Sequence, residues 1–267
     1  MEKIPRRLYN VSKFKWCSHA ASCGDLSALQ WAMQHGAIWN ERTCANAALY
    51  GYLEIIQWAR GNGAPWDAST CGNAAANGHL DILQWARANG APWDEWTCMS
   101  AAANGHLEVL QWARSHGAPW NEHVCSHAAR GGRMNTLRWA RANGAPWDTW
   151  TCASAASYGH LHILKWARRH GAPWDTWTCR AALESSHADC MHWALAHGVP
   201  WSNAETAYKV RNISAIMSLP FRGVTVWLMK HKRGTPEIDC IAKLFICELY
   251  NLIPLTGSIC DVIINYC

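Results

Sequence analysis

Hydrophobic and polar positions alternate with a helical period along this chain, and the arrangement returns every 27 residues. Within one such unit, residues 70–94, the apolar positions that share a helical arc are Leu80, Ile82, Leu83, Trp85 and Ala86. The pattern predicts an amphipathic helix over about residues 79–89, ended by Gly90 and Pro92. A shorter helix with a small-residue face is predicted before it, with Thr70 as its N-cap and a left-handed Gly78 as its end.

Several residue types keep the 27-residue step without an insertion. The cysteines of this series are Cys17, Cys44, Cys71, Cys98, Cys125, Cys152 and Cys179. One series of tryptophans comprises Trp31, Trp58, Trp85, Trp112, Trp139, Trp166 and Trp193. The second comprises Trp39, Trp66, Trp93, Trp120, Trp147, Trp174 and Trp201. A hairpin of two short helices buries its apolar side only against neighbouring hairpins, so the sequence predicts a stacked repeat solenoid. We expect both tryptophan series to form its core, since each indole can bury roughly 150–250 Å².

The unit resembles an ankyrin repeat. The residues that carry the resemblance are Ala74, Ala75, Gly78, His79, Leu80, Leu83, Gly90 and Ala91. The stretch from Gly105 to Arg114 is most similar to the tryptophan-rich ankyrin repeats of giant DNA virus proteins. The resemblance implies an all-α, ankyrin-type helix-turn-helix repeat solenoid that acts as a non-enzymatic scaffold for protein–protein interaction, with a host factor as partner. The T-P-L-H opening is absent and the period is shorter than the usual ~33 residues, so we expect shortened or absent β-hairpin fingers.

The repeat also divides the chain. We expect an N-terminal cap at 1–16, seven 27-residue repeats at 17–205, a degenerate eighth repeat at 206–227 and a helical C-terminal cap at 228–267. An alternative for the last segment is an F-box-like module, which would make the protein a ubiquitin-ligase substrate adaptor. The residues behind this alternative are Leu252, Pro254, Ile259, Val262, Ile263 and Tyr266.

Composition narrows the class of protein. Half of the residues are hydrophobic and 16% are charged, which favours a folded chain. The net charge of +5 is below what a dedicated nucleic-acid binder shows. The N-terminus lacks the apolar stretch of a secretory signal, and no segment is apolar and long enough to span a membrane. We therefore expect a monomer with reduced cysteines in the cytoplasm (of a host cell, if the protein is viral) or the nucleus.

The sequence contains no catalytic constellation, and neither an enzyme nor a cofactor is predicted. His123, Cys125 and His127 have ligand-like spacing, but zinc needs a fourth ligand and Cys125 belongs to the repeated cysteines, so we favour a structural role. A row of arginines could bind a nucleic-acid backbone, although a cation in the last turn of a helix also stabilises it. These arginines are Arg60, Arg87, Arg114, Arg141 and Arg168. For His79, His106 and His160 we expect hydrogen bonds within the turn.

Positions that vary between units are free of stacking constraints, and exposed Trp, Tyr and Arg side chains there are candidates for partner binding. On the short helices and their turns these are Met99, His127, Arg130, Arg180, Tyr50 and Tyr158. In the loops that precede the short helices we place Trp96, His123, Trp150 and Trp177. The alternative is that each of these tryptophans folds onto the neighbouring loop.

Overall fold

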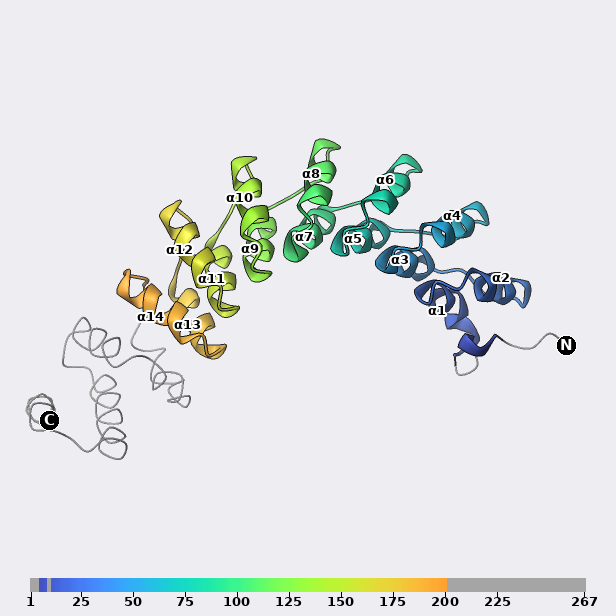
Figure 1. Ribbon diagram of the computed structural model, residues 1–267, viewed down its shortest axis with the longest axis horizontal. Helices are drawn as coiled ribbons and strands as arrows, with labels where there is room; N and C mark the ends of the chain where they lie inside the picture. The colour runs from blue at the N-terminus through green and yellow to red at the C-terminus, as the bar shows by residue number, and fades with distance from the viewer. Residues whose placement is uncertain (1–4, 9–10, 201–267) are drawn as a thin grey trace, which may run out of the picture. The chain divides into compact units, whose positions relative to one another are not determined.

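The computed structural model describes residues 5–8 and 11–200, and it divides into two units, Met1–Trp147 and Asp148–Cys267. Each unit is a row of helical hairpins, as Figure 1 shows for the labelled helices. In unit 1, the hairpins follow two short 3₁₀ helices, η1 (Arg6–Leu8) and η2 (Lys13–Lys15). The expected degenerate repeat and C-terminal segment, residues 206–267, lie outside the described residues.

Each hairpin consists of a first helix and a second helix. The first helices of unit 1 are α1 (Trp16–Ser22), α3 (Glu41–Tyr50), α5 (Ala68–Ala76), α7 (Glu95–Asn104) and α9 (His123–Arg130). Its second helices are α2 (Leu26–Gln34), α4 (Leu53–Gly61), α6 (Leu80–Ala88), α8 (Leu107–Ser115) and α10 (Met134–Ala142). Unit 2 contains the hairpins α11 (Thr149–Ser157) with α12 (Leu161–Arg169), and α13 (Thr176–Glu184) with α14 (Ala188–Ala196). Within each unit, every first helix packs against its own second helix and against the next first helix.

The helix ends differ from the sequence prediction at one position. Thr70 does not cap α5: it lies buried inside the helix, and the carboxylate of Asp67 accepts the N–H of Ser69 instead. Asp94 caps α7 in the same way. The helix ends at glycine are confirmed, because Gly78 and Gly90 adopt φ values of +76° and +84°.

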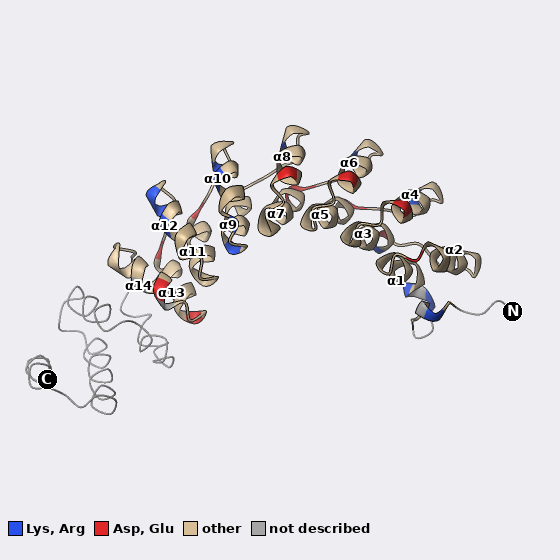
Figure 2. Ribbon diagram, in the orientation of Figure 1, with Lys and Arg blue, Asp and Glu red and all other residues tan. Residues whose placement is uncertain are grey.

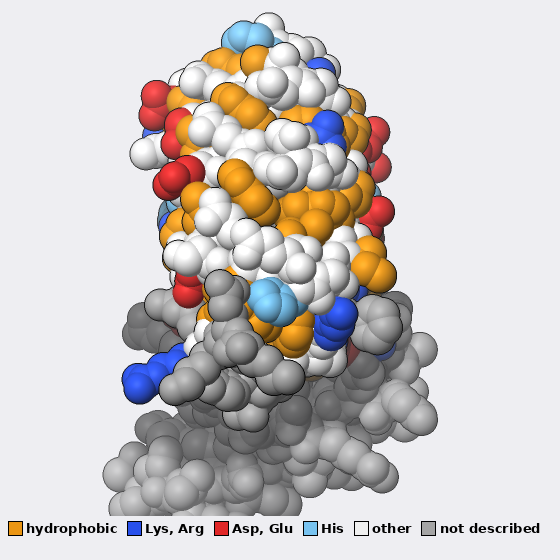
Figure 3. Space-filling view, turned by 90° about the vertical axis from the view of Figure 1, so that its right-hand side faces the viewer, with side chains coloured by type: hydrophobic (Ala, Val, Ile, Leu, Met, Phe, Trp, Pro, Cys, Tyr) orange, Lys and Arg blue, Asp and Glu red, His pale blue; other side chains and the backbone are white. Residues whose placement is uncertain are grey.

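The core consists of small and branched aliphatic side chains rather than tryptophan. Cys71, Ala74 and Ala75 of α5 are fully buried, as are Ile82 and Leu83 of α6. Their small first-helix face allows the close approach of successive first helices. The described indoles of both tryptophan series are only partly buried. Trp39 and Trp66 pack against the buried Cys44, Ala59 and Ala64, so the tryptophans border the core rather than fill it as expected. Figure 3 shows hydrophobic side chains still visible among polar atoms on the side of the molecule that faces right in Figure 1.

The turn histidine His106 connects two neighbouring hairpins, which differs from the prediction for this residue. His106 shares a hydrogen bond of 3.1 Å with the carbonyl of Ala76, in the preceding hairpin, instead of bonding within its own turn. Its imidazole lies so close to Gly78 that a Cβ there would come within 2.7 Å of the ring. Asn73 adds a second link by donating to the carbonyl of Ala45, one hairpin earlier, at 2.9 Å. Within unit 1, hydrogen bonds of this kind therefore position successive hairpins against one another.

Successive hairpins are joined by short extended segments. Among the described residues there is no β-strand, so these joints lack the β-hairpin finger of a full-length ankyrin repeat. The same residues include no helix with the length and apolar character needed to cross a membrane.

Candidate partner-binding surface

The predicted partner-binding residues lie on the first helices, not in loops. Trp96, Trp150 and Trp177 each occupy the second position of a first helix, and His123 begins α9. Loop placement was predicted because Thr was taken as the N-cap, whereas α7, α11 and α13 begin earlier, directly after an Asp, and α9 begins after Glu122.

We call the set of predicted positions on these helices and their C-terminal ends the first-helix face. Its members are Tyr50, Trp96, Met99, His123, His127 and Arg130 in unit 1, and Trp150, Tyr158, Trp177 and Arg180 in unit 2.

A capping bond fixes the backbone at four of these residues. The N–H of Trp96 donates to the carboxylate of Asp94 at 3.0 Å, and the N–H of Trp150 donates to Asp148 at 3.1 Å. The corresponding bonds of Trp177 and His123 go to Asp175 and Asn121, both at 3.0 Å. In all four cases the acceptor lies two residues earlier, so each of these side chains leaves the backbone at the same distance along the chain from its Asp or Asn.

In unit 2, two tryptophans and an arginine form one cluster. The rings of Trp150 and Trp177 meet edge to face, with centroids 6.0 Å apart. The guanidinium carbon of Arg180 lies 4.6 Å from the centroid of the Trp177 ring, and its Nε is 3.0 Å from the Glu184 carboxylate. Trp150 nevertheless keeps 51% of its surface exposed. Tyr158, at the opposite end of α11 and 47% exposed, does not belong to this cluster.

In unit 1, the residues of the first-helix face are spread over three helices. Trp96 is 39% exposed and lies across Gly72 of the preceding first helix, where a Cβ would come within 1.9 Å of the indole. The rings of His123 and His127 are 6.4 Å apart, and Nδ1 of His127 donates to the His123 carbonyl at 2.8 Å. Burial lowers the pKa of His127, and the nearby Arg130 acts in the same direction.

Met99 is partly buried, and Arg130 is exposed at the end of α9. Tyr50 ends α3, one hairpin before α5; it is 53% exposed and stacks near Tyr52 at 6.4 Å. The structure therefore places Tyr50 apart from the histidines of α9 rather than beside them.

The ligand-like spacing of His123, Cys125 and His127 does not produce a metal site. Cys125 is buried with its Sγ 4.0 Å from the Ala145 carbonyl, whereas His123 is exposed at the surface. In the described part of the chain, no three His, Cys, Asp or Glu side chains are grouped so that they could hold a metal ion. The other repeated cysteines are also buried core residues. This burial raises the pKa of the Cys98 thiol to about 12 and that of Cys44 to about 11.

The repeated arginines and tryptophans form a framework along the second helices. Arg87 donates to the carbonyl of Ala91, and its guanidinium carbon lies 4.0 Å from the centroid of Trp93. Trp93 in turn meets Trp112 of the next hairpin edge to face at 6.1 Å, and His116 stacks on Trp112 at 4.1 Å. The pairs Trp39–Trp58, Trp66–Trp85, Trp120–Trp139 and Trp174–Trp193 repeat this contact at 5.8–6.1 Å. Each pair joins two successive hairpins, which supports the structural interpretation of the arginine row.

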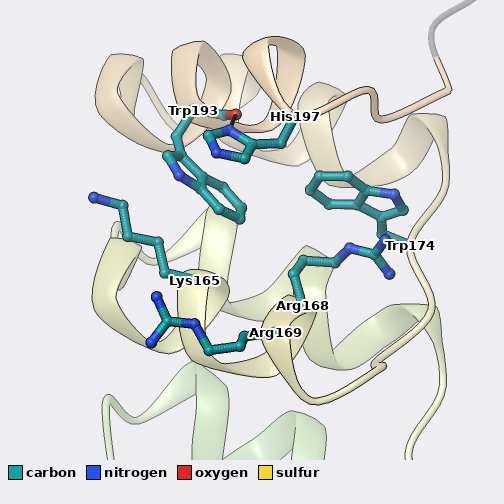
Figure 4. A pocket seen from close by; sticks show the side chains of 6 residues that line it. All are labelled: Lys165, Arg168, Arg169, Trp174, Trp193 and His197. Atoms are coloured by element: carbon teal, nitrogen blue, oxygen red, sulfur yellow. Dashed lines mark hydrogen bonds between the residues drawn. The ribbon is translucent and has the colours of Figure 1, made fainter.

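One pocket stands out in unit 2, between α12 and α14. Its volume is about 560 Å³, and its lining residues are Lys165, Arg168, Arg169, Trp174, Trp193 and His197. In the view of Figure 4, the two indoles and the imidazole lie above the basic side chains; the guanidinium of Arg168 lies beside Trp174, whereas the ends of Lys165 and Arg169 point to the left, away from Trp174. The sequence did not predict this pocket. Lys165 and Arg169 line it together with Trp193 and His197 only because α14 packs beside α12, and the repeat pattern does not show that contact.

Comparison with known proteins relates part of the chain to a known family of repeats. Residues 44–87 and 71–114 match the family model for ankyrin repeats (many copies). No curated protein sequence matches the chain. Among solved structures, the crystal structure of the human ASB11 ankyrin repeat domain is similar at 18% identity and a TM-score of 0.48, covering 59% of this chain and 84% of that one. The predicted fold class is confirmed for the described residues: they form stacked helical hairpins without β-strands, and residues 44–114 among them match ankyrin repeats.

Proposed function

We propose that the protein is a non-enzymatic scaffold that binds a protein partner through the first-helix face. Ankyrin repeats are generally protein–protein interaction scaffolds, and residues 44–114 match that family. The sequence resemblance to tryptophan-rich viral ankyrin proteins extends the proposal to a viral protein that engages a host factor.

One observation carries the assignment to this face. Only five large hydrophobic side chains are exposed among the described residues: Ile38, Tyr50, Trp96, Trp150 and Tyr158. Four of the five lie on the first-helix face. Exposed aromatic side chains of this kind are typical anchors of protein interfaces, because they supply a large contact area at a small cost in conformational entropy.

The geometry does not favour the rival function, nucleic-acid binding through the arginine row. Each of the five guanidinium groups lies 4.0–4.1 Å from the centroid of a tryptophan ring. Each also donates to an alanine carbonyl four residues later. Binding a phosphate backbone would require these structural contacts to be given up.

The test compares capture of cellular proteins by three forms of the full chain. Wild type and Ile38→Ala serve as positive control and matched control, since Ile38 is 65% exposed but lies outside the first-helix face. The double variant Trp150→Ala/Trp177→Ala removes the aromatic cluster of unit 2. We expect the partner to be retained by wild type and by Ile38→Ala, and lost by the double variant, while all three show the same helical circular dichroism spectrum.

Equal recovery of every captured protein by all three forms would refute the assignment to this face of unit 2. Specific capture of nucleic acid, with steep salt dependence, would replace it with the rival function.

A further inference from the structure

The pocket between α12 and α14 combines features that together point to one kind of ligand. Its walls contain two indoles, one imidazole and three basic groups, and none of the lining side chains is acidic. A volume of about 560 Å³ lies within the usual range for small-molecule sites, which is roughly 300–1,000 Å³. Basic side chains bind anionic groups such as phosphate, and aromatic side chains stack on flat rings such as nucleobases. A site that has both kinds of side chain suits a ligand that has both kinds of group.

The basic groups of the pocket are not equivalent. Arg168 is held by the Ala172 carbonyl and by the Trp174 ring, as in every other hairpin with this arginine. Lys165 and Arg169 are exposed and make no hydrogen bond or ion pair with any other described residue. They lie on the same face of α12, four residues apart. Among the described residues, therefore, no partner neutralises either charge.

The aromatic wall is already ordered. Trp174 and Trp193 meet edge to face at 5.9 Å, and His197 stacks on Trp193 at 4.2 Å. Nδ1 of His197 donates to the Trp193 carbonyl at 2.8 Å, which fixes the ring and leaves Nε2 as its remaining polar atom. A ligand would meet rigid rings, so little conformational entropy would be lost on binding.

The repeat supplies an internal comparison. The positions 81 residues earlier are Gln84, Arg87, Ala88, Trp93, Trp112 and His116. Their framework is the same, with the Trp93–Trp112 and Trp112–His116 contacts at 6.1 and 4.1 Å. The cations of Lys165 and Arg169 are missing there, replaced by Gln84 and Ala88. Second helices α4, α6 and α8 also carry an acid in the first turn, whereas α12 carries none, as Figure 2 shows in colour. The absence is shared by α2 and α10, and α14, on the other side of the pocket, carries Asp189 in its first turn.

We propose that the pocket of Lys165, Arg169, Trp174, Trp193 and His197 binds a nucleoside phosphate, with the two free cations on the phosphate and the aromatic wall against the base. Lys165 and Arg169 convert a structural framework, repeated along the chain, into a ligand site. This site is independent of the first-helix face, so the scaffold function and nucleotide binding can fail separately.

The test measures binding of adenosine monophosphate to the full chain by isothermal titration calorimetry. We expect saturable binding with a Kd at least about tenfold lower than that of adenosine or of inorganic phosphate. Adenosine alone contacts only the aromatic side chains, and inorganic phosphate alone contacts only the cations. The double variant Lys165→Gln/Arg169→Ala should weaken it at least about tenfold. This variant installs the residue types found at the same positions in α6, Gln84 and Ala88, so the fold tolerates them. Arg42→Gln, which removes an exposed cation elsewhere, should leave the affinity unchanged.

A second variant tests the internal comparison. Gln84→Lys/Ala88→Arg, added to the Lys165→Gln/Arg169→Ala background, should restore adenosine monophosphate binding at the framework of Trp93 and Trp112. Failure to restore it would refute the claim that two cations complete the site. Three other results would overturn the proposal: no saturable binding to wild type, equal binding of inorganic phosphate, or tighter binding of a phosphotyrosine amide than of the nucleotide.

Discussion

A buried hydroxyl that recurs in the first helices leads to a prediction about stability. The Oγ1 atoms of Thr43, Thr70, Thr97, Thr151 and Thr178 are buried, and none has a hydrogen-bond partner in the structure. At the same position α9 carries Val124, which is also fully buried. Valine has nearly the shape of threonine and the same branched Cβ, but no polar atom. The chain thus already contains the substitution that removes the unsatisfied group.

Thr97→Val should therefore stabilise the protein. A buried donor without a partner costs about 1–3 kcal/mol, and valine removes this cost without changing the packed volume. Helix propensity adds little, since threonine and valine have similar values. We expect the free energy of unfolding to rise by about 1 kcal/mol, equivalent to a Tm increase of roughly 2–4 °C for a chain of this size.

Urea unfolding followed by circular dichroism measures the effect, with fits that allow for more than two states because repeat arrays unfold in parts. Val124→Thr is the matched control and should destabilise by a similar amount, since it buries a hydroxyl where none is needed. The reasoning is refuted if Thr97→Val destabilises the protein while Val124→Thr is neutral, because the hydroxyl of Thr97 would then have a partner that the structure does not show.

Two further predictions concern the buried thiols and the glycine turns. Burial raises the pKa of Cys98 from 9.0 to about 12. Above pH 9 the folded state therefore keeps the thiol proton while the unfolded chain loses it. The free energy of unfolding should fall by about 1 kcal/mol per thiol between pH 9 and 10. Urea unfolding across this range should show the decline, and Cys98→Ala should make it shallower; a flat profile would contradict the burial. Gly90→Ala should cost about 1 kcal/mol for its left-handed backbone alone, because nothing lies within 4 Å of a Cβ there. Gly78→Ala should lower the free energy of unfolding by more than Gly90→Ala, because the imidazole of His106 must move to make room for the new Cβ. Equal losses for the two variants would mean that His106 is not fixed in its position.

The sequence was sufficient to predict the helical hairpins and their approximate bounds. A strict 27-residue period, together with glycines at helix ends, placed α6 within one residue of its observed bounds, because amphipathic periodicity reports directly on burial. The start of the first helices was misjudged because both Thr70 and Asp67 are acceptable N-cap residues. The recurrence of an Asp or Asn four residues before each of six repeated cysteines, from Cys44 to Cys179, was the available signal.

The burial of the tryptophans was harder to predict. Periodicity shows that a position is repeated, but a repeated position can lie at the edge of the stack as well as in its centre. Trp93 and Trp112 are edge residues that bridge two hairpins, and only the structure distinguishes them from core residues. The pocket in unit 2 depends in the same way on a contact between helices that pattern analysis does not supply.

The central claim is that two kinds of tryptophan have different roles: those along the second helices join hairpins, and those of the first-helix face recognise a partner. Partner capture by Trp120→Ala and Trp150→Ala, at a temperature where both are folded, tests it most directly. Trp120 contacts Trp139 and Arg114, whereas Trp150 is half exposed. We predict that Trp120→Ala keeps the partner and Trp150→Ala loses it. The reverse result, or equal capture by both variants, would contradict the account.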